Sequence, residues 1–99
     1  MYYAIIGEDV LESLPLRLAV RPAHLARLET LKAENRLLLA GPFPDSATQT
    51  GENPGFTGSL IVAEFDSLAD AQAWAEGDPY VAAGVYTRVT VKPFKRVLP

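Results

Sequence analysis

Acid–base chemistry in this chain of 99 residues centres on one histidine, His24, because the sequence holds no second histidine and no cysteine. Imidazole changes charge near neutral pH, so it can serve as a general base or a general acid. The stretch VRPAHLARLETL (residues 20–31) places His24 four residues before Leu28 and seven before Leu31. That spacing puts all three on one helix face. His24 is therefore either a hydrogen-bonded core residue or a base whose tautomer is fixed by a partner.

Asp78, in the stretch GDPY, is the best local candidate for that partner, because it lies between Gly77 and Pro79 in an expected rigid turn. A carboxylate that accepts a proton from one ring nitrogen leaves the other available for catalysis. The alternative is a turn aspartate that bonds its own backbone. Other side chains have a similar pair of interpretations, as ligand contacts or as ordinary surface and core groups: Arg17, Arg21, Arg36, Gly41, Pro42, Tyr80 and Tyr86.

The residue types present also argue against a serine nucleophile, a metal site, a phosphate-binding loop and nucleic-acid binding. The serines Ser46, Ser59 and Ser67 lack the flanking glycines of a nucleophile elbow. No pair of histidines has metal-ligand spacing, so we expect no metal, and the glycines of residues 51–58 lack the lysine of a phosphate-binding loop. With 9 Lys and Arg against 12 Asp and Glu, the net charge of −3 argues against nucleic acid as a partner.

The elements that must position these residues follow the order βαββαβ. Strands are expected at residues 2–7, 36–44, 59–65 and 85–97, the last being the longest. Helical spacing covers residues 10–35, where Pro22 is expected to divide it into two pieces, and residues 66–77, where Asp66 or Ser67 is the N-cap. A turn is expected at Gly41-Pro42, a polar loop over residues 45–58, and a turn with one helical turn over residues 78–84. This order predicts a single α+β domain over residues 1–99, with a ferredoxin-like antiparallel sheet and both helices on one face.

Both faces of the expected sheet are apolar near its middle. Alternation sets Tyr2, Ala4 and Ile6 against Tyr3 and Ile5 in the first strand, and the strand at 59–65 is similar. Helices on one face would leave the other apolar face uncovered, and such a face marks an interface. The simplest cover is a second copy of the chain, so we expect a homodimer packed sheet to sheet. Pro93 implies either an edge position for the last strand or a bulge near its end.

No apolar run approaches the roughly 20 residues that a membrane helix needs, and the first residues lack the pattern of a signal peptide. We therefore expect no membrane partner and a cytoplasmic location.

Five blocks, in this order, resemble the YciI-like (YCII-related) family over nearly the whole chain: RPAHLARL, RLLLAGPFP, GFTGSLIVAEF, AQAWAEGDPYVAAGVY and VTVKPFKRV. The resemblance implies a ferredoxin-like fold, dimers of the α/β-barrel type and a His–Asp active site in a cleft. The family's histidine matches His24, its aspartate matches Asp78, and its glycine–proline motif matches Gly41 and Pro42. A related branch includes a dehydrochlorinase of a chlorinated hydroxyhydroquinone.

The resemblance and the residues together predict a small enzyme without a cofactor, of the lyase or isomerase type. It would use acid–base chemistry for an isomerisation, an elimination or a hydrolysis-like reaction of a small polar or aromatic metabolite. His24 and Asp78 would be its catalytic pair, and Arg17, Arg36, Gly41, Pro42 and Tyr80 would contact the substrate. The alternative is a non-catalytic small-molecule-binding or accessory domain, since an apolar pocket with a few polar groups suits either use. Fold alone does not decide between them.

Overall fold

The expected element order is present in the structure, a computed structural model that describes residues 1–46 and 55–99. The elements are β1 (Tyr2–Asp9), α1 (Leu14–Ala33), β2 (Leu37–Pro44), β3 (Phe56–Glu64), α2 (Leu68–Glu76), α3 (Pro79–Ala82) and β4 (Tyr86–Phe94). The expected loop over residues 45–58 lies in part outside the described residues. Its last residues, from Phe56 on, belong to β3 instead.

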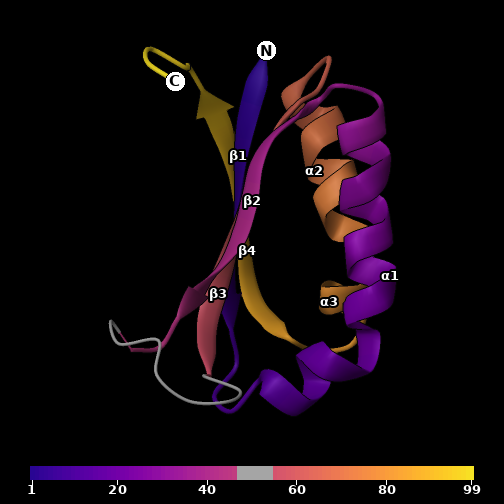
Figure 1. The fold of residues 1–99 in the computed structure, drawn as a ribbon, viewed down its shortest axis with the longest axis vertical. Coiled ribbons are helices and arrows are strands. Elements are labelled where there is room, and N and C mark those ends of the chain that lie inside the picture. The colour runs from indigo at the N-terminus through magenta and orange to yellow at the C-terminus, as the bar shows by residue number, and fades with distance from the viewer. Residues whose placement is uncertain (47–54) are drawn as a thin grey trace.

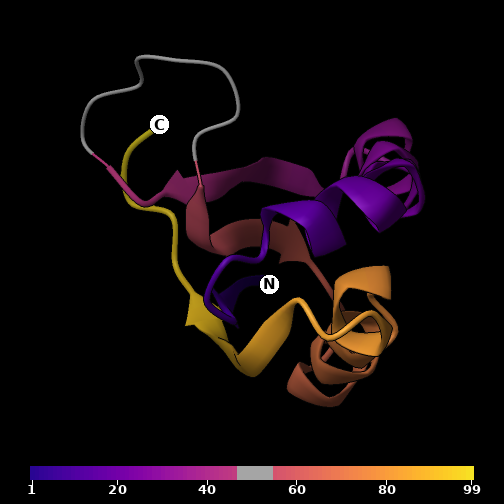
Figure 2. The ribbon, with the colours of Figure 1, turned by 90° about the horizontal axis from the view of Figure 1, so that it is seen from below.

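The four strands form one antiparallel sheet in the order β2-β3-β1-β4. The helices lie on one face of this sheet, and the opposite face carries no helix (Figure 1). Seen from below, sheet and helices form two layers (Figure 2). The predicted ferredoxin-like α+β arrangement is therefore confirmed. The position of β4 at the edge also agrees with Pro93, which has no backbone N–H to donate to a neighbouring strand.

The prediction of two helical pieces separated at Pro22 is wrong, because α1 is assigned as one helix that includes this proline. Proline within a helix removes one backbone hydrogen bond and crowds the preceding turn, which bends a helix without necessarily ending it. The first turns of α1 accordingly lie at an angle to the rest (Figure 1). The helix ends close to the expected place, where Asn35 adopts a left-handed φ of 58°.

Two expectations about the strands are also wrong. The turn expected at Gly41-Pro42 is absent, since β2 continues to Pro44. An edge strand tolerates these prolines because one of its sides pairs with no strand. The last strand is not the longest, because β4 and β3 each have 9 residues.

The core lies between the sheet and the helices. The inward residues of β1 and β3 alternate as expected, so Tyr3 pairs with Ala63 and Ile5 pairs with Ile61. Leu28 and Leu31 of α1 pack on them from the other layer. Three further core residues complete this cluster: Phe65, Ala71 and Ala75.

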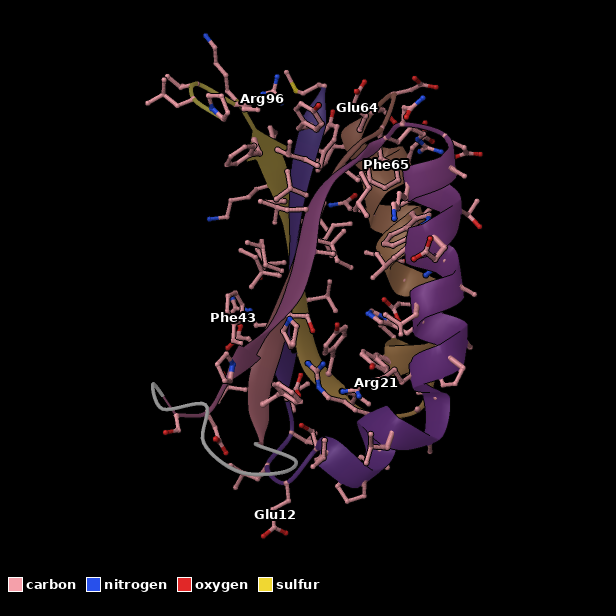
Figure 3. The ribbon with its side chains drawn as sticks, in the orientation of Figure 1. Glu12, Arg21, Phe43, Glu64, Phe65 and Arg96 are labelled. Atoms are coloured by element: carbon pink, nitrogen blue, oxygen red, sulfur yellow. The ribbon has the colours of Figure 1, made fainter. Side chains whose placement is uncertain are left out.

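The face of the sheet that lies away from the helices is apolar in its middle, as predicted, whereas β4 contributes the polar residues Thr90 and Lys92 to it. Figure 3 shows Phe43 on this face, whereas Phe65 lies between the sheet and the helices. Leu39, Phe43 and Phe94 are 46%, 40% and 38% exposed, respectively. Alternation in β1 and β3 places the open face's central residues between these edges: Ala4, Ile6, Leu60 and Val62.

No helix among residues 1–46 and 55–99 combines the length and the apolar character needed to cross a membrane.

Candidate active site

The inward face of α1 carries His24, which is 7% exposed. Arg17, Leu28 and Leu31 share this face, and these four are the buried residues of the helix. Their spacing of seven, four and three residues is that of one helical stripe. The position of the histidine on the sheet side of the helix was predicted from the same spacing.

Asp78 faces His24 at hydrogen-bond distance. Nδ1 of His24 lies 2.9 Å from both Oδ1 and Oδ2 of Asp78, and the carboxylate is 3% exposed. An ionised carboxylate can only accept, so Nδ1 carries the proton and donates it to Asp78. In the neutral imidazole the lone pair then lies on Nε2. The two residues are 54 positions apart in sequence, and the fold brings them together as expected.

The turn that holds Asp78 is fixed by the end of one helix and the start of the next. Ser67 begins α2 by accepting a hydrogen bond from the Asp70 backbone, as one of the two predicted caps, and Gly77 ends that helix. Asp78 is then the N-cap of α3, where its Oδ1 accepts from the Tyr80 N–H at 2.9 Å. Both interpretations of this aspartate therefore hold at once: it caps a turn, and it contacts the histidine.

Aromatic rings fix the plane of the imidazole. Tyr80 stacks on His24 with ring centroids 3.9 Å apart and planes within 8°. Tyr86 in turn packs edge-on against Tyr80 at 5.6 Å. The Tyr86 ring occupies the space beside Gly7, where a Cβ would lie 2.5 Å from that ring. Glycine in β1 thus makes room for the stack that orients His24.

Arg17 lies beside this pair and is held by a buried polar network. Its Nε and Nη2 donate to the two oxygens of Asp9 at 2.6 and 2.9 Å, and Nη2 also donates to Ser59 Oγ at 2.8 Å. Ser13 Oγ donates to the same Asp9 carboxylate at 2.5 Å. Burial acts to lower the pKa of Arg17, but the hydrogen bonds and charge of Asp9 raise it above its ordinary value. Arg17 is therefore a fixed, permanently charged group.

Arg27, one turn after His24, ties α1 to the end of α2. Its Nη2 donates to the Trp74 carbonyl at 2.7 Å, and its guanidinium lies 4.2 Å from the centre of the Trp74 ring. Burial lowers the pKa of Arg27, while the charge of Asp78 acts in the opposite direction. This contact holds the segment that leads into Asp78 against the helix that carries His24.

A cavity of about 310 Å³ opens between α1 and the sheet at this point. Figure 3 shows Arg21 in the space between α1 and the sheet. Polar and apolar groups share the lining: Arg17, Arg21, His24, Leu25, Leu28, Ala40, Gly41, Pro42, Ser59, Ile61 and Tyr80. Nε2 of His24 has no partner among the described residues and is not one of their buried unpaired atoms. It is therefore open to the cavity.

The cavity brings together most of the residues predicted as substrate contacts, namely Arg17, Gly41, Pro42 and Tyr80. Arg36 is the exception, because it is not among the lining residues. It pairs with Glu34 at 2.8 Å and donates to the Glu64 carbonyl at 3.1 Å. The position of Arg36 just before β2 places it at the other end of that strand from the cavity.

Sequence reasoning did not find Asp9, and it considered Ser59 only as a nucleophile. One signal could have indicated the first: Asp9, Ser13 and Arg17 follow one another at intervals of four residues. Ser59 is identified by pairing, since it lies opposite Gly7 in β1 and opposite Pro42 in β2. Its hydroxyl bonds Arg17 and not His24, so the histidine is not arranged to activate it. Within the described ranges, no cluster of three His, Cys, Asp or Glu residues is arranged to hold a metal.

This geometry defines a ferredoxin-like α+β protein with a buried His–Asp pair at the wall of a small cavity. Comparison with known proteins adds the family. A model of the YCII-related domain matches residues 1–95, and the chain belongs to that family. The resemblance noted in the sequence is thereby confirmed.

Relatives of known sequence cover nearly the whole chain. Protein YciI of Escherichia coli O6:H1 (strain CFT073) is 59% identical over 97 residues, which is 98% of this chain and 99% of the relative. A protein of Haemophilus influenzae (strain KW20) is 55% identical over 97 residues, which is again 98% of this chain and 99% of the relative.

Among solved structures, 5-chloro-2-hydroxyhydroquinone dehydrochlorinase (TftG) from Burkholderia phenoliruptrix AC1100, in complex with 2,5-dihydroxybenzoquinone, has a similar fold. It superimposes with a TM-score of 0.84 at 33% identity, covering 96% of this chain and 94% of that one.

Proposed function

We propose that this chain is a small enzyme that catalyses proton transfer on a single-ring metabolite, in an isomerisation or an elimination. His24 acts through Nε2 as the general base and then as the general acid. Asp78 is the positioning residue that fixes the tautomer and stabilises the imidazolium formed during the reaction. The observation that carries the proposal is the 2.9 Å contact of Nδ1 with both Asp78 oxygens, at the wall of a cavity.

The proposed proton transfer requires few groups other than these side chains. A proton transfer needs a base of suitable protonation state within hydrogen-bond reach and a group that stabilises the charge it creates. His24 supplies the first and the arginines of the cavity supply the second, so we expect no cofactor. The similar solved structure supports the reaction type because that protein is a dehydrochlorinase, and it supports the ligand class because it holds 2,5-dihydroxybenzoquinone, a single-ring compound.

The test follows exchange of the ring C–H protons of 2,5-dihydroxybenzoquinone in D2O by ¹H NMR, with chloride release from 5-chloro-2-hydroxyhydroquinone as a second readout. We expect the wild type to accelerate exchange, His24→Gln to lose about 10²–10⁴-fold in rate, and Asp78→Asn to lose a large part of that. Asp70→Asn, an exposed carboxylate on α2, is the matched control and should keep the full rate.

Acceleration that survives in His24→Gln would contradict the proposal, as would a wild type no faster than buffer with either compound. A wild type that binds 2,5-dihydroxybenzoquinone without accelerating exchange would instead support the non-catalytic binding domain. In that case the same cavity would serve recognition.

The partner proposed for the open face of the sheet is a second copy of this chain, packed sheet to sheet. The support is the exposed apolar surface of Leu39, Phe43 and Phe94 around the centre of that face. A self-complementary patch of this kind forms a closed two-fold dimer, which typically buries about 800 Å² on each partner.

Analytical ultracentrifugation tests this proposal with two matched variants. Leu39→Lys places a charge on the open face and should dissociate the dimer. Leu18→Lys places one on α1 at nearly equal exposure, 47% against 46%, and should leave the dimer intact. A wild type that sediments as a monomer of 10.7 kDa at micromolar concentration would contradict the dimer.

A further inference from the structure

The guanidinium of Arg17 has one edge that the protein does not use. Nε and Nη2 are occupied by Asp9 and Ser59, whereas Nη1 makes no hydrogen bond with any residue in 1–46 or 55–99. In those ranges the buried side-chain atoms without a partner are Arg27 Nη1 and the Tyr86 hydroxyl, so Nη1 of Arg17 is not sealed off. Arg17 is 2% exposed and lines the cavity. Its unused edge therefore faces that cavity.

The guanidinium is also held rigidly. It lies 5.1 Å from the centre of the Phe56 ring and 5.0 Å from that of Tyr80, in addition to its two bonds with Asp9. A donor fixed in this way loses little conformational entropy when it binds an acceptor. Tyr80 is the same ring that stacks on His24, so Arg17 and the imidazole share one aromatic neighbour. Their positions are thus fixed relative to each other.

The charges around the cavity are arranged in two layers. Its basic lining residues are Arg17, Arg21 and His24, and no carboxylate of the described residues is in the lining. Asp9 lies behind Arg17, and Asp78 lies behind His24. Arg21 forms no ion pair with any described residue, and Arg27 adds a further positive charge near Asp78. Three arginines against two aspartates leave a net charge of +1 while His24 is neutral, which matches a ligand of charge −1.

We propose that the ligand of this cavity is a single-ring compound that carries an acidic oxygen, a carboxylate or an enolate, and that this oxygen binds Nη1 of Arg17 with help from Arg21. This proposal rests on the proposed function for its chemical consequence. When Nε2 of His24 takes a proton from the CH2 carbon that lies next to a carbonyl in the keto tautomer of the ring, the C–H bond breaks and an N–H bond forms. The electron pair becomes a C=C bond, and the carbonyl π electrons move to oxygen. The resulting enolate oxygen is the charge that Arg17 stabilises.

Apolar groups complete the ligand class. Leu25, Leu28 and Ile61 line the cavity beside the charged groups, and a volume of about 310 Å³ lies at the lower end of small-molecule sites. The charged groups therefore select an anion, and the apolar walls and the volume select a small, flat body.

The experiment measures binding of benzoate and of benzamide at pH 7.5 by NMR titration, because the two share a ring and differ in charge. We expect benzoate to bind the wild type at least tenfold more tightly. Arg21→Met and Arg17→Lys should each reduce that preference to less than about threefold. Lysine keeps a positive charge for Asp9 but withdraws the second donor edge. Arg88→Met, which removes an exposed arginine of β4, is the control and should leave the preference unchanged.

Equal affinity for the two compounds, or no binding of benzoate, would overturn this proposal. So would a preference that persists in both Arg17→Lys and Arg21→Met. Arg21→Met keeps the test decisive if Arg17→Lys does not fold, since Arg21 forms no ion pair within residues 1–46 and 55–99. His24→Gln separates the two proposals: it should keep the preference for benzoate while it loses proton exchange.

Discussion

The space between the sheet and the helices has a polar end and an apolar end. The same face of α1 contributes residues to both. Leu28 and Leu31 pack at one end into an apolar cluster with Tyr3. Arg17 and His24 lie at the other end among hydrogen-bonded polar groups. Apolar contacts are non-directional, so a cluster of them tolerates small adjustments. A buried polar group needs a specific partner, and losing one partner leaves the other unsatisfied. The polar end therefore depends on exact pairing, whereas the apolar end can adjust to small changes.

Arg17→Met is expected to have the largest effect on stability, because it leaves Asp9 buried without its ion-pair partner. The Asp9 side chain is 0% exposed, and breaking such a pair from one side costs about 3–5 kcal/mol. Urea unfolding at pH 7 measures the loss. The double variant Asp9→Asn with Arg17→Met should recover a substantial part of it, since no unpaired charge then remains.

The exposed pair of Arg36 and Glu34 provides the comparison for that result. Its side chains are 37% and 49% exposed, so Arg36→Met should cost less than about 1 kcal/mol. Equal losses for Arg17→Met and Arg36→Met would contradict the distinction between the polar end and ordinary surface pairs.

Leu31→Ala is expected to have the next largest effect and to act at the apolar end. Leu31 is 1% exposed, and truncation of a buried leucine to alanine costs about 2–5 kcal/mol through lost burial and the remaining cavity. Proton exchange at saturating 2,5-dihydroxybenzoquinone should stay within about threefold of wild type in the folded variant. Leu18→Ala, at 47% exposure, should change unfolding by less than about 1 kcal/mol. A specific loss of exchange rate in folded Leu31→Ala would show that the two ends are not separable.

Tyr86 gives the smallest effect and the one that depends on pH. Burial raises the pKa of its hydroxyl to about 12 from the ordinary value of 10.0. Between these values the unfolded chain binds fewer protons than the folded one, so stability is complete below pH 10 and falls as pH rises toward 12. The loss is on the order of 2 kcal/mol. Urea unfolding of wild type and Tyr86→Phe from pH 8 to 11.5 should show a shallower decline in the variant.

The same variant is informative at pH 7. The Tyr86 hydroxyl is buried, and although the nearby Ser59 hydroxyl acts to lower its pKa, the two do not meet in the geometry of a hydrogen bond and no other described residue is its partner. Its removal should therefore leave stability unchanged or raise it by up to about 1 kcal/mol. A clear loss at pH 7 would mean that this hydroxyl belongs to the polar network.

The polar end was predictable from sequence where a residue's role depends on local spacing. His24 shares a helical period with Leu28 and Leu31, which fixes its face, and Asp78 precedes a proline that fixes its turn. The distance between His24 and Asp78 depends on how α1 and α2 pack, and the spacing of residues in the sequence does not determine that packing. The family resemblance supplied that pairing, and the fold shows the contact.

The remaining features depend on tertiary structure and had no local signal. Arg36 resembles Arg17 as an arginine at a helix end, but it follows α1 and lies near Glu64 at the far end of the sheet. Ser59 joins the site through its pairing opposite Gly7. The effect of Pro22 also depends on context, since packing on the sheet keeps α1 one helix across the lost backbone bond.

Asp78 has two structural roles, and this limits the substitutions that position 78 can accept during evolution. One of its oxygens caps α3, and the same carboxylate orients His24, so most replacements would weaken the shape of the protein and its chemistry together. Asparagine is the exception, because it caps helices as well as aspartate does but carries no negative charge. A lineage could take that single step and keep its fold while losing the negative charge next to His24. If the proposed function holds, the side chain at position 78 therefore reports on the state of His24 while the fold stays the same.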